Sequence, residues 1–265
     1  MELNKENYYS TEANLEYMSA SQFKDFEKCE RHALAKLVGE YQEESTKPML
    51  IGSYVDSYFS NELEEFKERN PQIFKKDGTL LKDFEKANEI IEAIKNDPMF
   101  LQHISGANQV IMVGTINGVK FKIKIDSLLE NAIVDLKVMS SITDLVWAQD
   151  EEGNWKKIDF VANYGYDIQG AIYQEIVRQN IGKKLPFILA PITKEENPDK
   201  ALIEIDQYYL DKALEKVKAS CERYDLIKKG IIEPVGCGQC PSCRKDKKVT
   251  EIVSYKELFN KVEED

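Results

Sequence analysis

Histidine is scarce in this sequence: His32 and His103 are the only two among 265 residues. This scarcity argues against a metal site built on several imidazole ligands. No apolar run approaches the ~18–20 residues that cross a bilayer, so the sequence contains no transmembrane helix and no membrane partner is expected. The first residues lack a basic start followed by an apolar stretch, and we therefore expect no secretory signal and a cytoplasmic protein.

The composition is that of an ordinary globular protein, with 42% hydrophobic and 31% charged residues. The net charge of −11 weakens the case for a protein that coats or shapes DNA. It weakens the case for a DNA enzyme less, because whole-chain charge governs solubility more than the potential of one cleft. In a metal nuclease, bound cations offset the carboxylates where phosphate arrives.

The five cysteines are an odd number in a chain with no export signal, so a disulfide framework is not expected. Three of them form Cys237-x₂-Cys240-x₂-Cys243. With one remote cysteine, this spacing indicates either a 4Fe–4S cluster or a structural Zn²⁺ site, and the alternative is a turn with free thiols. Cys221 lies in a helical stretch and is expected to be an ordinary buried residue.

Apolar spacing predicts helices from Ser19 to Leu34, over residues 49–66 and over residues 82–96. A hairpin follows, because Asn117-Gly118 favours a type I′ turn between two alternating strands, 109–116 and 119–126. The remaining expected elements are a strand at 132–138, a helix at 165–181, strands at 186–191 and 201–206, a helix at 207–229 and a short helix around Tyr255–Leu258.

This order predicts one α/β domain over residues 1–265 with an N-terminal helical section. Residues 1–16 are polar and expected to be flexible, residues 109–206 form the catalytic sheet core, and residues 230–265 form a cysteine-containing C-terminal segment.

Asp126 ends one predicted strand, and Asp135 and Lys137 lie two residues apart on the next, hence on one face. If the strands are neighbours, two carboxylates and an ammonium group converge. Carboxylate oxygens suit Mg²⁺ or Mn²⁺, and a lysine beside them can stabilise developing negative charge. The alternative is a solvated charged face, which is the usual explanation for an isolated Asp-x-Lys.

Asp126, then Asp135-Leu136-Lys137, then Gln169-x₃-Tyr173 resembles the PD-(D/E)xK nuclease superfamily in its RecB-like branch. The chain is most similar to phage and prophage exonucleases of the exodeoxyribonuclease VIII (RecE) type, relatives of lambda exonuclease. The resemblance implies a restriction-endonuclease-like core, a mixed central sheet flanked by helices. It also implies Mg²⁺- or Mn²⁺-dependent 5′-to-3′ digestion from linear duplex ends, which leaves single strands for recombination.

The resemblance also assigns roles to residues. Lys137 becomes the catalytic lysine, while Gln169 and Tyr173 support the site or contact DNA. Relatives carry a histidine where this chain has Asp56, which is either a metal ligand or a helix-surface charge. The expected metal-binding residues are Asp56, Asp126, Asp135 and Leu136.

Some RecB-like nucleases join an N-terminal cysteine to three C-terminal ones in an iron–sulfur site. Cys29 matches that position, which implies the ligands Cys29, Cys237, Cys240 and Cys243. The partners that the resemblance implies are double-stranded DNA ends, a single-strand-annealing recombinase, and further copies of the chain in a trimeric or tetrameric ring.

Lys120, Lys122 and Lys124 alternate toward the Asp126 face and are candidates for binding DNA phosphates, or else form a solvent-facing strand. The aromatic residues Tyr54, Tyr58, Phe59, Tyr164 and Tyr166 are expected mostly in the core, with base stacking as the alternative. Gln109 opens the hairpin, and little direct role is expected for it. Two rival functions remain: a non-catalytic DNA-end or protein-binding module, and a single-strand nuclease of the repair or CRISPR type.

Overall fold

The computed structural model describes residues 1–42, 44–149, 153–245 and 247–255. The helices are α1 (Thr11–Glu16), α2 (Ala20–Lys28), α3 (Glu30–Leu37), α4 (Lys47–Phe59), α5 (Leu63–Arg69), η1 (Pro71–Ile73, a 3-10 turn), α6 (Lys82–Lys95), α7 (Pro98–Ile104), α8 (Phe160–Tyr164), α9 (Tyr166–Ile181), α10 (Gln207–Lys228) and α11 (Pro241–Lys245). The strands are β1 (Ala107–Ile116), β2 (Val119–Leu128), β3 (Ile133–Met139), β4 (Val146–Gln149), β5 (Trp155–Ile158), β6 (Phe187–Thr193) and β7 (Ile203–Glu204). The helix expected around Tyr255–Leu258 falls outside the described residues from position 256 onward.

The central sheet has the strand order β1-β2-β3-β6-β7 and is mixed, as the sequence predicted. Strands β3 and β6 run parallel, whereas the other neighbours are antiparallel. The β2–β3 pairing is short: it joins Ser127 to Val134 and Leu128 to Ile133. Beyond these pairs β2 and β3 separate and leave a gap in the middle of the sheet.

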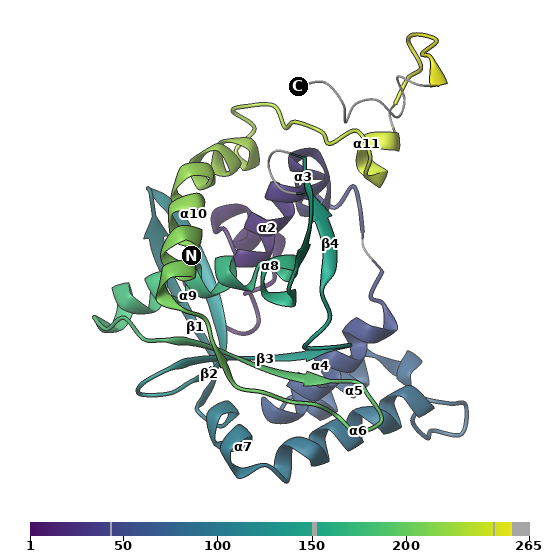
Figure 1. Cartoon of the computed structure of the whole chain (residues 1–265), viewed down its shortest axis with the longest axis vertical. Helices are drawn as coiled ribbons and strands as arrows, with labels where there is room; N and C mark the ends of the chain where they lie inside the picture. Colours follow the sequence, from purple (N-terminus) through teal and green to yellow (C-terminus); the bar gives the residue numbers. More distant parts are fainter. Residues whose placement is uncertain (43, 150–152, 246, 256–265) are drawn as a thin grey trace.

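Helices cover both faces of the sheet (Figure 1). Helices α2, α9 and α10 pack on one face, where their apolar residues meet Phe121, Ile123 and Phe187. Helices α4, α6 and α7 pack on the other face against Val134 and Ile192. None of the helices in the described part of the chain combines the length and apolar character needed to cross a bilayer.

The β1–β2 hairpin forms as predicted. Asn117 and Gly118 have φ values of 46° and 80°, the positive pair that a type I′ turn requires. The single helix expected over residues 49–66 is instead two helices, α4 and α5, because the chain turns at Asn61, whose φ is 61°. The small β4–β5 hairpin has no counterpart in the sequence prediction, since its short strands are mostly exposed and lack a clear apolar alternation.

The N-terminal segment corrects another expectation. The sequence predicted flexible residues over 1–16, yet the structure places helix α1 there, capped by Ser10. Tyr8 and Ala13 of this segment are buried. Met18 then pairs with β2, donating from its N–H to Lys120 O at 2.8 Å and accepting from Lys122 N at 2.9 Å. The segment therefore packs along the part of β2 that has left β3.

Candidate active site

The separation of β2 and β3 brings the predicted acidic residues together. Asp126 and Asp135 are the first residues past the last β2–β3 pair, Ser127 with Val134. The N–H of Leu136 donates to Asp126 Oδ2 at 3.1 Å. Lys137 Nζ lies 2.5 Å from Asp135 Oδ2, in an ion pair whose carboxylate side is almost completely buried. The geometry thus unites Asp126, Asp135 and Lys137 at one point and does not leave them on a solvated face.

Helix α9 holds both strands in place through the predicted Gln-x₃-Tyr pair. Gln169 Nε2 donates to Asp135 Oδ1 at 2.7 Å. One turn along the helix, the Tyr173 hydroxyl donates to Lys124 O at 3.0 Å. Both side chains are buried, so their contacts favour the supporting role over direct contact with DNA.

Asp56 comes from helix α4, on the other side of the sheet from α9. It lines the cleft with Asp126 and Asp135. Asp56 therefore belongs to the acidic group of the cleft and is not a charge on the outer surface of the helix. Burial raises the pKa of Asp56. Burial, with the neighbouring carboxylates of Asp135 and Asp56, raises the pKa of Asp126 well above its ordinary value. Clustered carboxylates of this kind repel one another unless a cation lies among them.

The lysine of the site is held as an ammonium. Burial opposes its charge, but the carboxylates of Asp135 and Asp126 outweigh burial and raise the pKa of Lys137. The carboxylates of Asp56, Asp126 and Asp135 supply hard oxygen donors in a cleft that Lys24, Lys124 and Lys137 also line. These donors fit a hard divalent cation such as Mg²⁺ or Mn²⁺.

Gln109, for which the sequence predicted little direct role, lies beside the acidic residues. Its φ is 53°, unusual for a residue other than glycine, at the point where β1 passes Asp126. Its Oε1 is buried and accepts no hydrogen bond within the described residues. With Asp56, Asp126 and Leu136 it lines a small cavity beneath the cleft. The positive φ and the unused acceptor beside the carboxylates make Gln109 a candidate for a supporting role in the site.

The cleft above these residues has a volume of about 620 Å³ and opens to solvent. Lys24 of α2 lines it, and burial and then the nearby Lys137 lower the pKa of Lys24 to about 8. Lys24 Nζ donates to Tyr164 O at 3.1 Å and lies 5.6 Å from the centre of the Tyr166 ring. The sequence analysis assigned no role to Lys24.

The three candidate DNA-binding lysines have three different environments. Lys120 pairs with Glu16 at 2.9 Å and does not line the cleft. Lys122 is buried, and its ammonium binds Tyr8 O and Asn14 Oδ1, which leaves it no freedom to bind phosphate. Lys124 alone combines partial exposure with a place in the cleft. Strand alternation failed here because the N-terminal segment covers the face that the sequence left to solvent.

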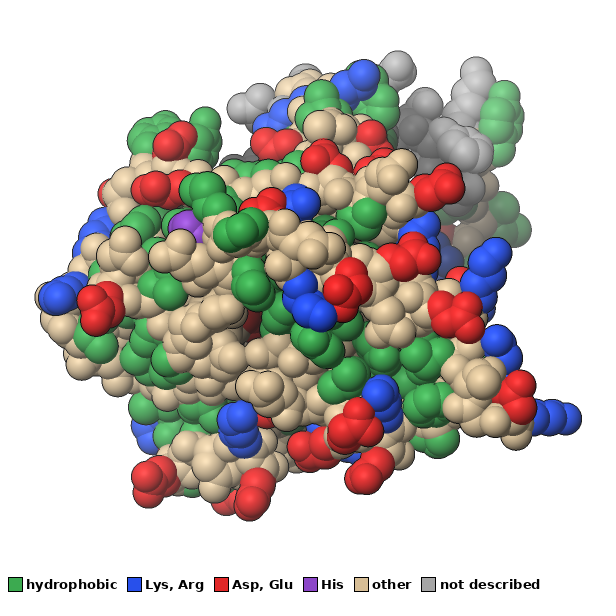
Figure 2. Space-filling model, turned by 90° about the horizontal axis from the view of Figure 1, so that it is seen from below, with side chains coloured by type: hydrophobic (Ala, Val, Ile, Leu, Met, Phe, Trp, Pro, Cys, Tyr) green, Lys and Arg blue, Asp and Glu red, His purple; other side chains and the backbone are tan. Residues whose placement is uncertain are grey.

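The described surface shows no broad basic patch on the side of helices α4 to α7, where acidic and basic side chains are intermixed (Figure 2).

The aromatic residues that were expected in the core do not all lie in the same environment. Tyr54 is buried against Phe66 and Phe84, in the core position that the sequence predicted. Tyr166 instead lies beside the site, with Lys137 Nζ 5.6 Å from its ring centre.

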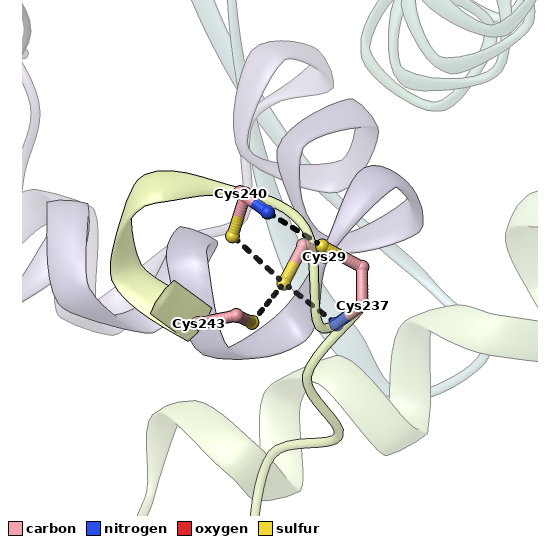
Figure 3. A group of neighbouring side chains, drawn as sticks. All are labelled: Cys29, Cys237, Cys240 and Cys243. Carbon is pink, nitrogen blue, oxygen red and sulfur yellow. Dashed lines mark hydrogen bonds between the residues drawn. The ribbon is translucent and has the colours of Figure 1, made fainter. Parts of the chain in front are cut away.

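A second constellation lies apart from the cleft. Cys29 stands at the junction of α2 and α3, Cys237 and Cys240 lie in the loop that leads into α11, and Cys243 lies within α11 (Figure 3). The four sulfur atoms of Cys29, Cys237, Cys240 and Cys243 lie within 4.8 Å of one another. Cys29 Sγ is 3.5 Å from Cys243 Sγ and 3.6 Å from Cys240 Sγ.

The surroundings of these cysteines suit a metal thiolate site. Backbone N–H groups of Gln239 and Cys240 lower the pKa of Cys237 to about 6, which favours its thiolate. A side chain at Gly236 would bring a Cβ within 2.8 Å of Cys243 Sγ, so the loop needs glycine there. Cys221 is separate and buried, with its thiol 3.6 Å from Ile116 O, in keeping with an ordinary core role.

Known proteins with similar sequences and structures agree with a nuclease-like fold. Residues 19–246 match the family model of a PDDEXK-like domain of unknown function (DUF3799). A crystal structure of a protein from Eubacterium rectale, described as a candidate exonuclease, is 46% identical in sequence. The alignment covers 99% of this chain and 100% of that one, with a TM-score of 0.92. A search of curated proteins found no match.

Proposed function

This chain belongs to the PDDEXK-like nuclease family, and from that premise we propose that it is a metal-dependent exonuclease that degrades linear duplex DNA from its ends. The observation that carries the proposal is the convergence of Asp126, Asp135 and Lys137 where β2 and β3 separate. A lost nuclease site would have no chemical reason to keep a buried carboxylate in an ion pair with Lys137 and a second carboxylate beside it. This argues against the rival reading as a non-catalytic binding module.

The residues that would hold a divalent cation are Asp126 and Asp135, with Asp56 on the opposite wall. Leu136 can contribute only its backbone carbonyl, while its N–H orients Asp126. When bound, such a cation supplies charge neutralisation at the scissile phosphate and an activated water.

The protein side of the reaction rests on two fixed groups. Lys137, held as an ammonium by Asp135, can orient the attacking water and stabilise the negative charge that develops on the phosphate oxygens. Gln169 keeps Asp135 turned toward the same point through its amide N–H. The attacking water loses its proton to solvent or to a carboxylate of the cluster, and the leaving oxygen departs as the bond to phosphorus breaks.

The preference for duplex ends and the 5′-to-3′ direction rest on the resemblance to exodeoxyribonuclease VIII and lambda exonuclease. The description of the Eubacterium rectale neighbour as a candidate exonuclease supports digestion from an end of the strand. The test is digestion of linear duplex and single-stranded DNA, each labelled at the 5′ or the 3′ end, beside a circular duplex labelled internally. Loss of the 5′ label first from linear duplex alone supports the proposal. Preferential digestion of single strands favours the repair or CRISPR type, and cleavage of circles contradicts an exonuclease.

We propose the partners of the protein on the basis of the same resemblance. A single-strand-annealing recombinase would receive the strand that digestion leaves, and a trimer or tetramer would keep the enzyme on its substrate. Light scattering across micromolar concentrations tests the assembly, and a monomer throughout would remove this part without affecting the catalytic proposal.

The cysteine site completes the proposal as a structural metal centre. Four thiolates at ~2.3 Å from one Zn²⁺ lie ~3.8 Å from each other in a tetrahedron, close to the separations of Cys29 from Cys240 and Cys243. A 4Fe–4S cluster binds each thiolate to a different iron and needs the sulfurs farther apart. Metal analysis of protein purified without oxygen distinguishes them, because only the cluster adds iron, sulfide and visible absorbance.

A further inference from the structure

Two adjacent tyrosines of the N-terminal segment stand on the wall of the cleft. Tyr8 is buried, whereas Tyr9 leaves 67% of its surface exposed. Their rings meet edge to face, with centres 4.9 Å apart. Both residues line the same cleft as Asp126 and Asp135. The exposed ring of Tyr9 is therefore accessible to a ligand in the cleft.

The chain on both sides of Tyr9 is held in place by contacts with β2. The buried ammonium of Lys122 binds Tyr8 O, donates to Asn14 Oδ1 at 2.7 Å and lies 4.6 Å from the Tyr8 ring centre. The backbone of Met18 is paired with β2 on the far side of helix α1. The residue before Tyr9 and the helix after it are therefore both attached to the sheet that carries the active site.

Lys124 connects the tyrosines to the acidic residues. Its Nζ lies 4.8 Å from the Tyr9 ring centre and 6.0 Å from that of Tyr8. Its backbone oxygen is fixed by Tyr173, and it precedes Asp126 by two residues on β2. An ammonium group beside an exposed aromatic face, next to a phosphodiester site, offers both halves of a nucleotide a partner: the ring stacks a base and the cation meets a phosphate.

We propose that Tyr9 and Lys124 form a stacking subsite for an unpaired nucleotide of the substrate strand, adjoining the scissile phosphate. The inference rests on the proposed nuclease function and adds a substrate-positioning residue to it. The nucleotide must be unpaired because a base within a duplex has its faces covered by its neighbours, and only a separated base can stack on a side chain. Tyr9 would thus select for strand ends that have been opened.

The experiment compares the parent with Tyr9→Ala and Tyr9→Phe, and with Tyr209→Ala as a matched control. Tyr209 is an exposed tyrosine on α10 that does not line the cleft. The probe is an oligonucleotide duplex with 2-aminopurine at one of the last three positions of the digested strand, bound in Ca²⁺. Stacking on tyrosine quenches the probe's fluorescence. The same variants are assayed for KM and kcat on unmodified DNA in Mg²⁺.

The parent, Tyr9→Phe and Tyr209→Ala should quench the probe at one position, and Tyr9→Ala should lose that quenching. Tyr9→Ala should also raise KM about tenfold while kcat changes less, the size expected for loss of one stacked base. Equal quenching and equal KM in Tyr9→Ala and the parent would overturn the subsite and leave the nuclease function standing. Absence of cleavage by the parent would contradict the proposed function, and the fluorescence comparison would still decide the subsite.

Discussion

Gln169 donates a 2.7 Å hydrogen bond to the carboxylate of Asp135, across 34 positions of the sequence. Tyr173, four residues further along α9, binds the backbone of Lys124 on β2. One face of one helix therefore holds both strands at the point where they part. This explains why the two side chains occur one helical turn apart: the spacing matches the gap between β2 and β3, so that Asp126 and Asp135 stay close although their strands no longer pair.

The first prediction concerns this hydrogen bond. Gln169→Leu should keep the fold but leave Asp135 free to turn, because the amide is the donor that fixes one of its oxygens. Loss of such an orienting partner typically weakens metal affinity or activity about 10–100-fold. A titration of nuclease activity with Mn²⁺ should show the activation curve moved to higher metal concentration.

The matched control for this variant is Gln174→Leu. Gln174 is buried on the same helix but binds Leu185 O and Gln207, away from the acidic residues. It should lower stability without moving the Mn²⁺ curve. Identical metal dependence in Gln169→Leu and the parent would show that the hydrogen bond does not serve the site.

The second prediction concerns the cysteine site. Cys29→Ser should remove bound zinc or iron and lower the unfolding temperature, because metal binding by four thiolates contributes directly to folding. The loss of stability should be greatest where the α2–α3 junction meets α11 and the loop before it. Backbone hydrogen exchange should accelerate there. Cys221→Ser, a buried cysteine outside the cluster, should retain the metal. Full metal content in Cys29→Ser would remove Cys29 from the ligand set.

The third prediction follows from the buried ammonium under the N-terminal segment. Burial lowers the pKa of Lys122 from 10.5 to about 8. Between these two pH values the unfolded chain binds the proton that the folded chain has lost, so stability rises with pH in this window. The parent should gain up to about 1.4 kcal/mol per pH unit relative to Lys122→Met in urea unfolding from pH 8 to 10.5.

Lys228, whose pKa burial also lowers to about 8, remains in both proteins; the charge of Lys122 adds a smaller part of that lowering, so the difference between the two stability curves belongs mainly to Lys122. Removing its ammonium also leaves Tyr8 O without a donor, which lowers the stability of Lys122→Met by a constant amount. Parallel stability curves for the two proteins would mean that Lys122 keeps an ordinary pKa in the folded state.

Local signals in the sequence were sufficient for the hairpin and for helix α9. Asn117-Gly118 specifies its turn through the backbone alone, and the Gln169–Tyr173 spacing is fixed by the helix. They were also sufficient for the Asp126–Asp135–Lys137 group, because the motif order carried information about strand neighbours. They failed where a contact is distant in sequence: Lys122 alternates like a surface residue, yet residues 8–14 cover it. The sequence singled out Gln109 only as the residue that opens the hairpin, because its positive φ and its buried oxygen without a hydrogen bond depend on the folded structure.

The most direct test of the account compares the parent with Lys137→Ala on end-labelled linear duplex DNA, with Mg²⁺ and with EDTA. Lys184→Ala serves as the control, since Lys184 pairs with Asp211 outside the cleft. The account predicts cleavage by the parent and by Lys184→Ala in Mg²⁺ and none in EDTA. Lys137→Ala should stay folded and bind DNA, yet cleave about 10²–10³-fold more slowly, because its ammonium acts where charge develops. Cleavage at the parent rate by a folded Lys137→Ala, or undiminished cleavage by the parent in EDTA, would contradict the assignment of this site.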